Sequence, residues 1–438
     1  MDISTDQRRH AQDLLDFIDQ SPSPWHAVDT LAQRLRTEGF SELDEREDWA
    51  LRPGVRHFVI RGGSSLIAFR VGETSPAKGG FRLIGAHTDS PGLRLKPQGA
   101  HGAELLRLGV DVYGGPLLAT FADRDLSLAG RVCLRGRAGI EQRLIRFDRP
   151  LLRLPNLAIH MNRKVNDEGL KFNKQTELPL IIGAIQASLG AQERFREWLA
   201  RQADCAVDDL LSFELNVYDT QKGAFWGAEG EFLADSQIDN LSSCHAGLIA
   251  LMGASTAVPQ TQVAAFFDHE EIGSESHKGA DGSFLGDVLE RLAVGLGDDR
   301  NGFRRGLARS LMVSADAAHA FNPNFPNAYE PLHSVQVNGG PAVKINVNQR
   351  YATDAPTEAL FKELCRQAGV PGQLYVHRSD LGCGSTIGPM TAARLGIPTL
   401  DCGTPMWAMH SVRESAGVLD QGWFADLLRT FLATTDPL

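Results

Sequence analysis

The stretch AFFDHEEIGSESHKGADG, residues 265–282, places two adjacent glutamates, Glu270 and Glu271, directly after an apolar run. That run, QVAAFFD at residues 262–268, has the length and composition of a strand buried in a parallel or mixed sheet. Open sheets of this kind bind ligands beyond the carboxyl ends of their strands. We therefore expect the two glutamates to mark a functional site at a strand end.

Helical and strand-like segments alternate from about residue 233 onward. Helical spacing is found in NLSSCHAGLIALMG, TEALFKELCRQAG and LDQGWFADLLRTFLA, and short apolar runs in SLMVSAD, AVKINVN, QLYVHR and IPTLDCG. The first 96 residues add two helical segments, a hairpin made of RHFVIR and SSLIAFRVG, and the apolar run GFRLIGAHTDS. Residues 1–96 and 233–438 are therefore predicted to form one α/β domain, a mixed sheet covered by helices.

The middle of the chain has a different texture. Residues 97–232 contain Gly-punctuated, β-prone pieces such as RLGVDVYGG, LSLAGRVCLRG and FELNVYD, with one helical interlude near residues 176–200. A chain of 438 residues is also too long for one simple core. We interpret residues 97–232 as an inserted, mainly β domain.

The composition, 42% hydrophobic and 22% charged residues, is ordinary for a globular protein. The apolar runs are shorter than the roughly 18–20 residues that a membrane span needs, and MDISTDQRRHAQDLLDFIDQ has the pattern of an amphipathic helix rather than a signal peptide. These features predict a cytoplasmic protein. The net charge of −10 argues against a nucleic-acid partner, because phosphate binding needs clustered Lys and Arg. Six scattered cysteines without a C-x-x-C pair predict neither a disulfide framework nor a thiolate zinc site.

Acid and imidazole side chains follow several predicted strands or begin predicted helices: His87, Asp89, Asp239, Glu270, Glu271, Asp316 and His410. Taken singly, each is most simply a capping or turn residue. Brought together, the carboxylates would raise one another's pKa unless cations balanced them. Two divalent metals would do so, and nitrogen and oxygen ligands without thiolates favour zinc, with manganese or cobalt as substitutes.

The adjacent glutamates suggest a division of labour. On a loop after a strand, neighbouring side chains point to different sides, so one can bind metal while the other acts as a base for water. In the pattern H-x-D, Asp89 can hold the ring of His87 in one tautomer. The sequence HEEIG has Gly273 where the helical zinc motif H-E-x-x-H needs a second histidine, which excludes a thermolysin-like site.

Several long motifs, in the same order, resemble those of aspartyl aminopeptidases, a family of di-zinc exopeptidases. They include GAHTDSPGLRLKP, DRDLSLAGRV, PNLAIHMNR, IDNLSSCHAGL, DHEEIGS, SADAAHAFNPN, VKINVNQRYAT and CGSTIGPMTAARLGIPTLDCG, and the resemblance covers nearly the whole chain. It implies removal of the N-terminal residue from peptides, with a preference for Asp or Glu. It also implies that the inserted domain forms a dimer contact and roofs the active site, and that larger tetrahedral dodecamers are typical.

The resemblance further implies a role for each site residue. One zinc would be held by His87 and Asp316 and the other by Glu271 and His410, with Asp239 bridging them, Glu270 as general base and Asp89 supporting His87. His160, in the motif AIHMNR, would reach the partner subunit's site and support the transition state. Gln237 and Asn322 depart from the family pattern by replacing an arginine and a histidine, which affects the expected pocket electrostatics but no ligand.

A preference for acidic side chains requires a fixed cation that no ligand carboxylate already consumes. Lys344 is our candidate, because a charged residue within the apolar run AVKINVN is rarely buried without a task. An outward-facing strand lysine is the simpler alternative. Two other functions stay open at this point: a different dinuclear hydrolase, such as a deacylase or carboxypeptidase, and a scaffold with a vestigial site.

Overall fold

The computed structural model describes residues 3–184, 190–255 and 257–435, which belong to two compact units. Unit 1 comprises Met1–Asp89, Gly223–Met409 and Glu414–Leu438, and unit 2 comprises Ser90–Lys222 with His410–Arg413. The expected boundaries were 96/97 and 232/233. The first of these falls inside strand β5 (Gly92–His101) of unit 2, and strand β11 (Ala224–Trp226) pairs within unit 1, which moves both boundaries toward the N-terminus.

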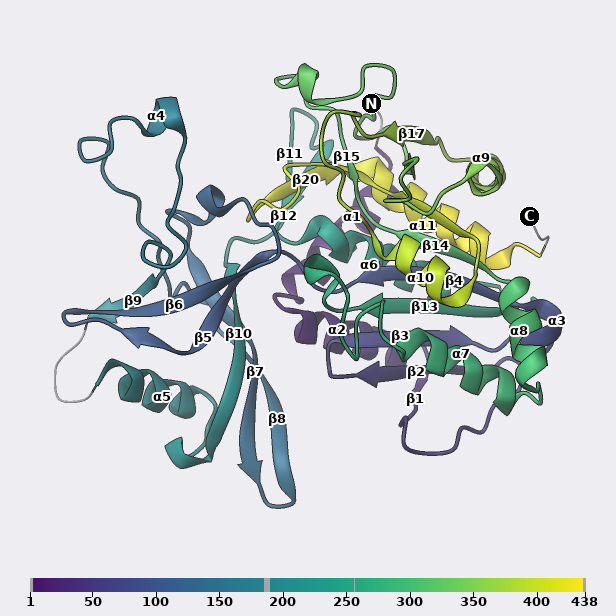
Figure 1. The fold of residues 1–438 in the computed structure, drawn as a ribbon, viewed down its shortest axis with the longest axis horizontal. Helices are drawn as coiled ribbons and strands as arrows, with labels where there is room; N and C mark the ends of the chain where they lie inside the picture. Colours follow the sequence, from purple (N-terminus) through teal and green to yellow (C-terminus); the bar gives the residue numbers. More distant parts are fainter. Residues whose placement is uncertain (1–2, 185–189, 256, 436–438) are drawn as a thin grey trace. The chain divides into compact units, whose positions relative to one another are not determined.

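Unit 1 is built on a nine-stranded mixed sheet (Figure 1). Its strands, in spatial order, are β1 (Ser41–Glu42), β2 (Arg56–Arg61), β3 (Ser65–Arg70), β13 (Thr261–Phe267), β4 (Phe81–His87), β14 (Leu311–Ala315), β18 (Thr399–Gly403), β16 (Ala342–Ile345) and β17 (Gln373–Val376). The four central strands, from β13 to β18, run parallel to one another, whereas β3 and β16 are antiparallel to their central neighbours. The predicted mixed-sheet α/β class is confirmed.

Both faces of this sheet are buried, because alternate side chains of its central strands pack into two different helical layers. Ala264 and Phe266 pack with α1 (Thr5–Asp19), α2 (Pro24–Thr37), α6 (Ile238–Met252), α9 (Ala355–Ala368) and α11 (Val418–Ala433). Val263, Ala265 and Phe267 pack with α7 (Phe284–Gly295), α8 (Arg300–Ala308) and α10 (Ile387–Leu395), while the single turn α3 (Pro76–Gly79) precedes β4.

Helix α6 lies especially close to the sheet. A Cβ atom at Gly247 would come within 3.2 Å of Ile84 Cγ2 and 3.3 Å of the Phe266 ring, so glycine allows this approach. The N-terminal helix has the predicted amphipathic character, with Leu14, Leu15 and Ile18 buried, and a capping box starts it.

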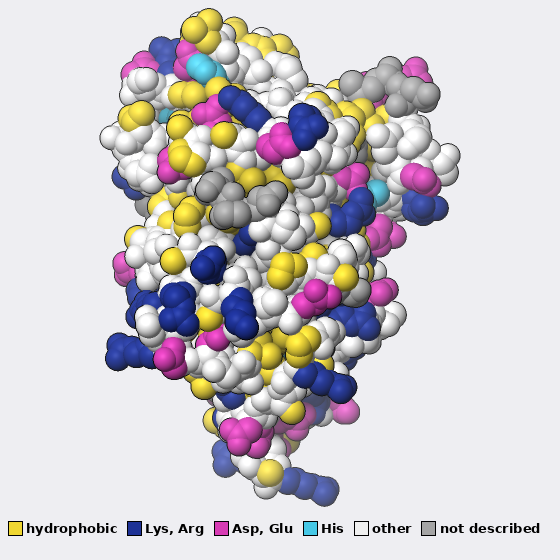
Figure 2. Space-filling model, turned by 90° about the vertical axis from the view of Figure 1, so that its right-hand side faces the viewer, with side chains coloured by type: hydrophobic (Ala, Val, Ile, Leu, Met, Phe, Trp, Pro, Cys, Tyr) yellow, Lys and Arg dark blue, Asp and Glu magenta, His cyan; other side chains and the backbone are white. Residues whose placement is uncertain are grey.

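A second, five-stranded sheet of unit 1 contains β11, β12 (Phe232–Asp235), β20 (Glu414–Gly417), β19 (Pro405–Trp407) and β15 (Ala318–His319). Two 3₁₀ turns, η3 (Glu270–Ile272) and η4 (Pro326–Ala328), lie in loops of this unit. Among the helices of the described residues, none combines the length and apolar character that crossing a membrane requires. The face drawn in Figure 2 carries Lys and Arg side chains interspersed with Asp and Glu.

Unit 2 is an antiparallel six-stranded sheet in the order β8 (Gly139–Arg146), β7 (Leu126–Gly136), β10 (Leu210–Asp219), β5, β6 (Leu105–Tyr113) and β9 (Leu180–Ala184). Helix α5 (Ala191–Gln202) packs Phe195 and Leu199 onto it, and α4 (Val165–Glu168), η1 (Leu118–Phe121) and η2 (Val207–Asp209) are short turns. The predicted helix near 176–200 is wrong in its first part, because the apolar residues at 180–184 pair with β6 as a strand. Residues 185–189 of that prediction lie outside the described residues.

Candidate active site

Three neighbouring parallel strands of unit 1 end at one edge of the nine-stranded sheet. Strand β4 ends at His87, β13 leads into Asp268 and the two glutamates, and β14 leads into Asp316. Their registers pair Phe267 with His87 and Ser314 with Gly85, so these strand ends lie at the same level. Parallel topology therefore brings residues far apart in sequence to one place.

Helix α6 adds Asp239 to this edge. The backbone N–H of Asp239 donates to Glu414 Oε2 at 2.9 Å, and Asn240 Nδ2 donates to Ala315 O at 2.8 Å. Asp239 and Asn240 have non-helical backbone angles, and the peptide bond between them is cis. The start of α6 is thus fastened both to β20 and to the end of β14.

The side chain of His87 lies at the centre of these carboxylates. Its Nε2 atom is 3.6 Å from Asp239 Oδ1, 3.9 Å from Glu270 Oε2 and 3.7 Å from Asp316 Oδ2. Two groups of possible metal ligands share this histidine: His87 with Glu270 and Asp316, and His87 with Asp239 and Glu271. Within each group, the ligand atoms lie within 4.8 Å of one another. One imidazole nitrogen with several carboxylate oxygens is a donor set that zinc accepts.

Asp89 contacts both His87 and the two adjacent glutamates. Nδ1 of His87 lies 2.9 Å from the backbone carbonyl oxygen of Asp89 and 3.5 Å from Oδ1 of its carboxylate, which directs Nε2 toward the carboxylates. The same carboxylate accepts the backbone N–H groups of Glu270, at 3.1 Å, and Glu271, at 3.2 Å. Asp89 therefore holds the ligand histidine and also the first turn of η3.

The many carboxylates close together raise the pKa values of Glu270 and His87. Burial raises the pKa of Glu270 well above its usual range, and the negative charges of Asp316, Glu271 and Asp89 raise it further, against the opposing effect of His87. Burial disfavours the charged form of His87, but the charges of Glu270, Asp89 and Asp239 outweigh that effect and raise its pKa. A bound divalent cation would relieve this mutual repulsion.

Lys344, on β16, is buried, with 2% of its surface exposed. Its Nζ donates to Asp316 Oδ1 at 2.8 Å and to Ala317 O at 3.2 Å, and it lies 5.0 Å from the centre of the Tyr351 ring. The alternative of an outward-facing lysine is therefore wrong. The lysine is nevertheless already paired with Asp316, a candidate ligand, which the sequence pattern did not indicate.

The remaining two expected site residues belong to unit 2. His160 is exposed in the segment 155–164. His410 has its Nδ1 3.0 Å from Gly115 O, and its backbone carbonyl accepts the N–H of Leu117 at 2.9 Å. Within the described residues, the two metal-ligand groups do not include His410.

A family model described as Aminopeptidase I zinc metalloprotease (M18) matches residues 17–432 of this chain. The chain belongs to the M18 family of zinc aminopeptidases. As a member, it is a hydrolase that acts on peptide bonds as an exopeptidase, in a family that uses zinc.

Individual relatives agree with the family. "Probable M18 family aminopeptidase 2" of Pseudomonas paraeruginosa is 47% identical over 428 residues, which cover 97% of this chain and 98% of that protein. The corresponding protein of Azotobacter vinelandii is 48% identical over 426 residues, with coverages of 97% and 98%. Among solved structures, Ape4 in its complex with Nbr1 has a TM-score of 0.94 at 37% identity, covering 99% of this chain and 88% of that one. The S. cerevisiae mApe1 dodecamer has a TM-score of 0.85 at 28% identity, covering 97% of each chain.

Proposed function

We propose that this M18 aminopeptidase works with two zinc ions per chain and prefers peptides that begin with Asp or Glu. The observation that carries the two-metal part is the pair of ligand groups around His87, which together use five side chains from four elements or loops. In the proposed assignment, His87 and Asp316 hold one ion, Glu271 and His410 hold the other, and Asp239 bridges them. Manganese or cobalt would be substitutes for zinc.

Glu270 is the proposed general base. Bound zinc supplies the Lewis acidity that polarises a peptide carbonyl and makes water more acidic. The carboxylate of Glu270 then takes a proton from the attacking water and returns it to the departing amine. Asp89 supports both Glu270 and His87 through the contacts described above.

Lys344 is the proposed reader of the acidic side chain. An ammonium group has three N–H donors, and the described residues use two of those on Lys344, for Asp316 and Ala317. The third is left for a substrate carboxylate, in a buried setting where such a pair is strong. The pairing with Asp316 means that Lys344 would serve the metal ligand and the substrate together.

The proposed enzyme is cytoplasmic and works as a homo-oligomer with at least a dimer as its unit. The homo-oligomer is supported by the structural similarity to mApe1, which was solved as a dodecamer. His160 is proposed to reach the active site of a neighbouring subunit and to stabilise the transition state there. Its exposure on unit 2 leaves it accessible to another subunit.

A panel of substrates tests the proposal. Asp-, Glu-, Leu- and Ala-p-nitroanilides are compared with N-acetylated forms and with peptides that differ only at the C-terminus, before and after chelation. We expect cleavage of the free-amine substrates only, fastest for Asp and Glu, lost with chelator and restored by zinc. Equal rates for N-acetylated substrates would favour a deacylase, and dependence on the C-terminal residue would favour a carboxypeptidase.

A further inference from the structure

A buried ion pair joins Asp268 and Lys278, the residues on either side of the loop that carries Glu270 and Glu271. Nζ of Lys278 is 2.6 Å from Oδ2 of Asp268, and the exposed fractions of these side chains are 5% and 0%. The hydroxyl of Ser64, between β2 and β3, is 2.6 Å from both groups, accepting from Lys278 and donating to Asp268. Three buried polar groups thus satisfy one another at the end of β13.

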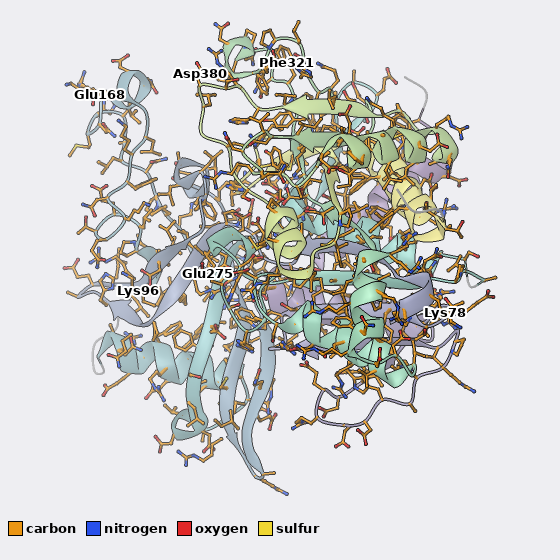
Figure 3. The ribbon with its side chains drawn as sticks, turned by 45° about the vertical axis from the view of Figure 1, so that its right-hand side comes forward. Lys78, Lys96, Glu168, Glu275, Phe321 and Asp380 are labelled. Atoms are coloured by element: carbon orange, nitrogen blue, oxygen red, sulfur yellow. The ribbon has the colours of Figure 1, made fainter. Side chains whose placement is uncertain are left out.

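This ion pair closes the loop that carries Glu270 and Glu271, since Asp268 and Lys278 flank it on either side (Glu275 marks the loop in Figure 3). Ser65 also links Asp268 and Lys278, through hydrogen bonds to their backbone groups. Its Oγ accepts the N–H of Asp268 at 2.8 Å and donates to Lys278 O at 2.9 Å. The other carboxylate oxygen of Asp268, Oδ1, accepts the N–H of His269 at 2.8 Å, one residue before Glu270.

The fold makes room for the lysine at one particular glycine. Gly62 has a φ of +64°, and a Cβ atom there would lie 2.9 Å from Cδ of Lys278. The turn that contains Gly62 and Ser64 also reaches the ligand histidine, because Ser64 O accepts the hydroxyl of Thr88, next to His87, at 2.7 Å. The turn therefore contacts the Lys278 ion pair as well as Thr88, the neighbour of the candidate ligand His87.

We propose that Lys278 is a positioning residue, whose charge holds Asp268 and thereby fixes Glu270 and Glu271 in their places toward the metal site. This inference rests on the proposed function of the two glutamates. Without the ammonium, the buried Asp268 carboxylate would keep its hydrogen bonds from Ser64 Oγ and the His269 N–H, with the His269 ring 3.6 Å away, but would lose the cation that balances its charge. The loop would then rearrange to bring Asp268 to water, and the two glutamates would move with it.

The test compares Lys278→Met with the double variant Lys278→Met/Asp268→Asn. Zinc affinity is measured by titrating metal-free protein against a chelating indicator, and kcat and KM with the best p-nitroanilide substrate. We expect Lys278→Met to lower both zinc affinity and kcat by about 10–100-fold, as loss of residues that orient metal ligands does. The second change removes the unpaired charge, so it should recover most of each loss.

Two control variants separate positioning from general stability. Lys362→Met removes the lysine of an exposed ion pair with Glu358 on α9 and should change neither quantity. Leu292→Ala opens a cavity in the buried face of α7 and should lower Tm while leaving zinc affinity unchanged.

The inference is overturned if Lys278→Met keeps normal zinc affinity and kcat, or if Asp268→Asn brings no recovery, because a packing role would not depend on charge. Zinc affinity is measured without substrate. A wild-type protein that binds zinc but cleaves none of the panel would therefore reject the proposed function and still allow the Lys278 comparison.

Discussion

The two units hold their candidate catalytic side chains in opposite ways. In unit 1, His87 and Asp89 are buried, and each makes contacts that fix its orientation. In unit 2, His160 lies in an exposed segment beside Met161, which is 75% exposed, and Leu157, which is 68% exposed. Glu168, in the following turn, marks this region in Figure 3.

The side chains of unit 1 are therefore preorganised within the chain, whereas the segment around His160 is exposed and not held in this way. Bringing carboxylates together in a buried site costs free energy during folding. Polar groups that are already held in place can then stabilise the transition state without reorganising. Exposed Leu and Met side chains around a histidine instead indicate a surface that gains by being covered. We therefore expect changes in unit 1 to act on metal and chemistry, and changes near His160 to act through association.

The largest effect is expected for Asp239→Ala. Asp239 is the proposed bridge between both ions, so its loss should remove more metal than any other single ligand change and bring activity close to background. Mass spectrometry of the purified protein measures zinc per chain. Retention of two zinc ions would contradict the bridging role.

Glu270→Gln should lower kcat by about 10²–10⁴-fold, because a general base is lost while the proposed ligands remain. Zinc content should stay near that of the wild type. Glu271→Gln is the matched control, and it should lose zinc as well as activity. The reverse pattern would mean that the two glutamates exchange roles.

His160→Ala should lower kcat by about 10²–10³-fold, as loss of one transition-state donor does, without loss of zinc. Activity should also fall on dilution as the oligomer dissociates, which sedimentation and rate measurements can follow together. A monomer with full activity would rule out the cross-subunit role.

Lys344→Met should shift substrate choice. We expect the loss in kcat/KM for Asp and Glu substrates to exceed that for Leu and Ala by about 2–5 kcal/mol, the range for removing one partner of a buried, hydrogen-bonded charge pair. A smaller, common loss should accompany it, because Asp316 also loses its partner. Equal losses on all four substrates would mean that Lys344 does not recognise the substrate side chain.

The smallest effect concerns acid stability of α1. Burial, with a contribution from His245, lowers the pKa of His10 to about 4. Because the folded pKa lies below the unfolded value of about 6.5, the unfolded state binds more protons between these pH values, and stability is lost as pH falls through that window. Between pH 7.5 and pH 5, the free energy of unfolding of the wild type should fall by up to about 2 kcal/mol more than that of His10→Gln. Thermal unfolding at both pH values measures this, with His101→Gln as an exposed control, and parallel losses would argue against it.

Much of this molecule was predictable from short-range patterns. The run at 262–268 forms β13, and the hairpin around Gly62 and Gly63 forms as predicted, because periodicity and turn residues act locally. The unit boundaries were less accessible, since β11 joins unit 1 through long-range contacts: it pairs with β12, which in turn pairs with the distant β20, and Phe225 packs against the core of unit 1.

The candidate site divides in the same way. The acids near His87 could be selected because each follows a strand or starts a helix. The partners of Lys344 could not, since no local pattern links β16 with Asp316. Asp268 and Lys278 were also missed. The only available signal was an acid at the end of a buried strand followed, within one loop, by a lysine.

Strand order in the nine-stranded sheet has a consequence for synthesis on the ribosome. Strands β3 and β4 follow closely in the chain, yet β13 lies between them in the sheet. Translation must pass through residues 90–222 of unit 2 before β13 appears, and the stretch from β4 to the end of β13 takes about 10–40 s at ordinary elongation rates of roughly 5–20 residues per second. During that interval the facing edges of two apolar strands lack the strand that will pair with them. The nascent chain should therefore be a substrate for ribosome-associated chaperones until residue 267 has emerged.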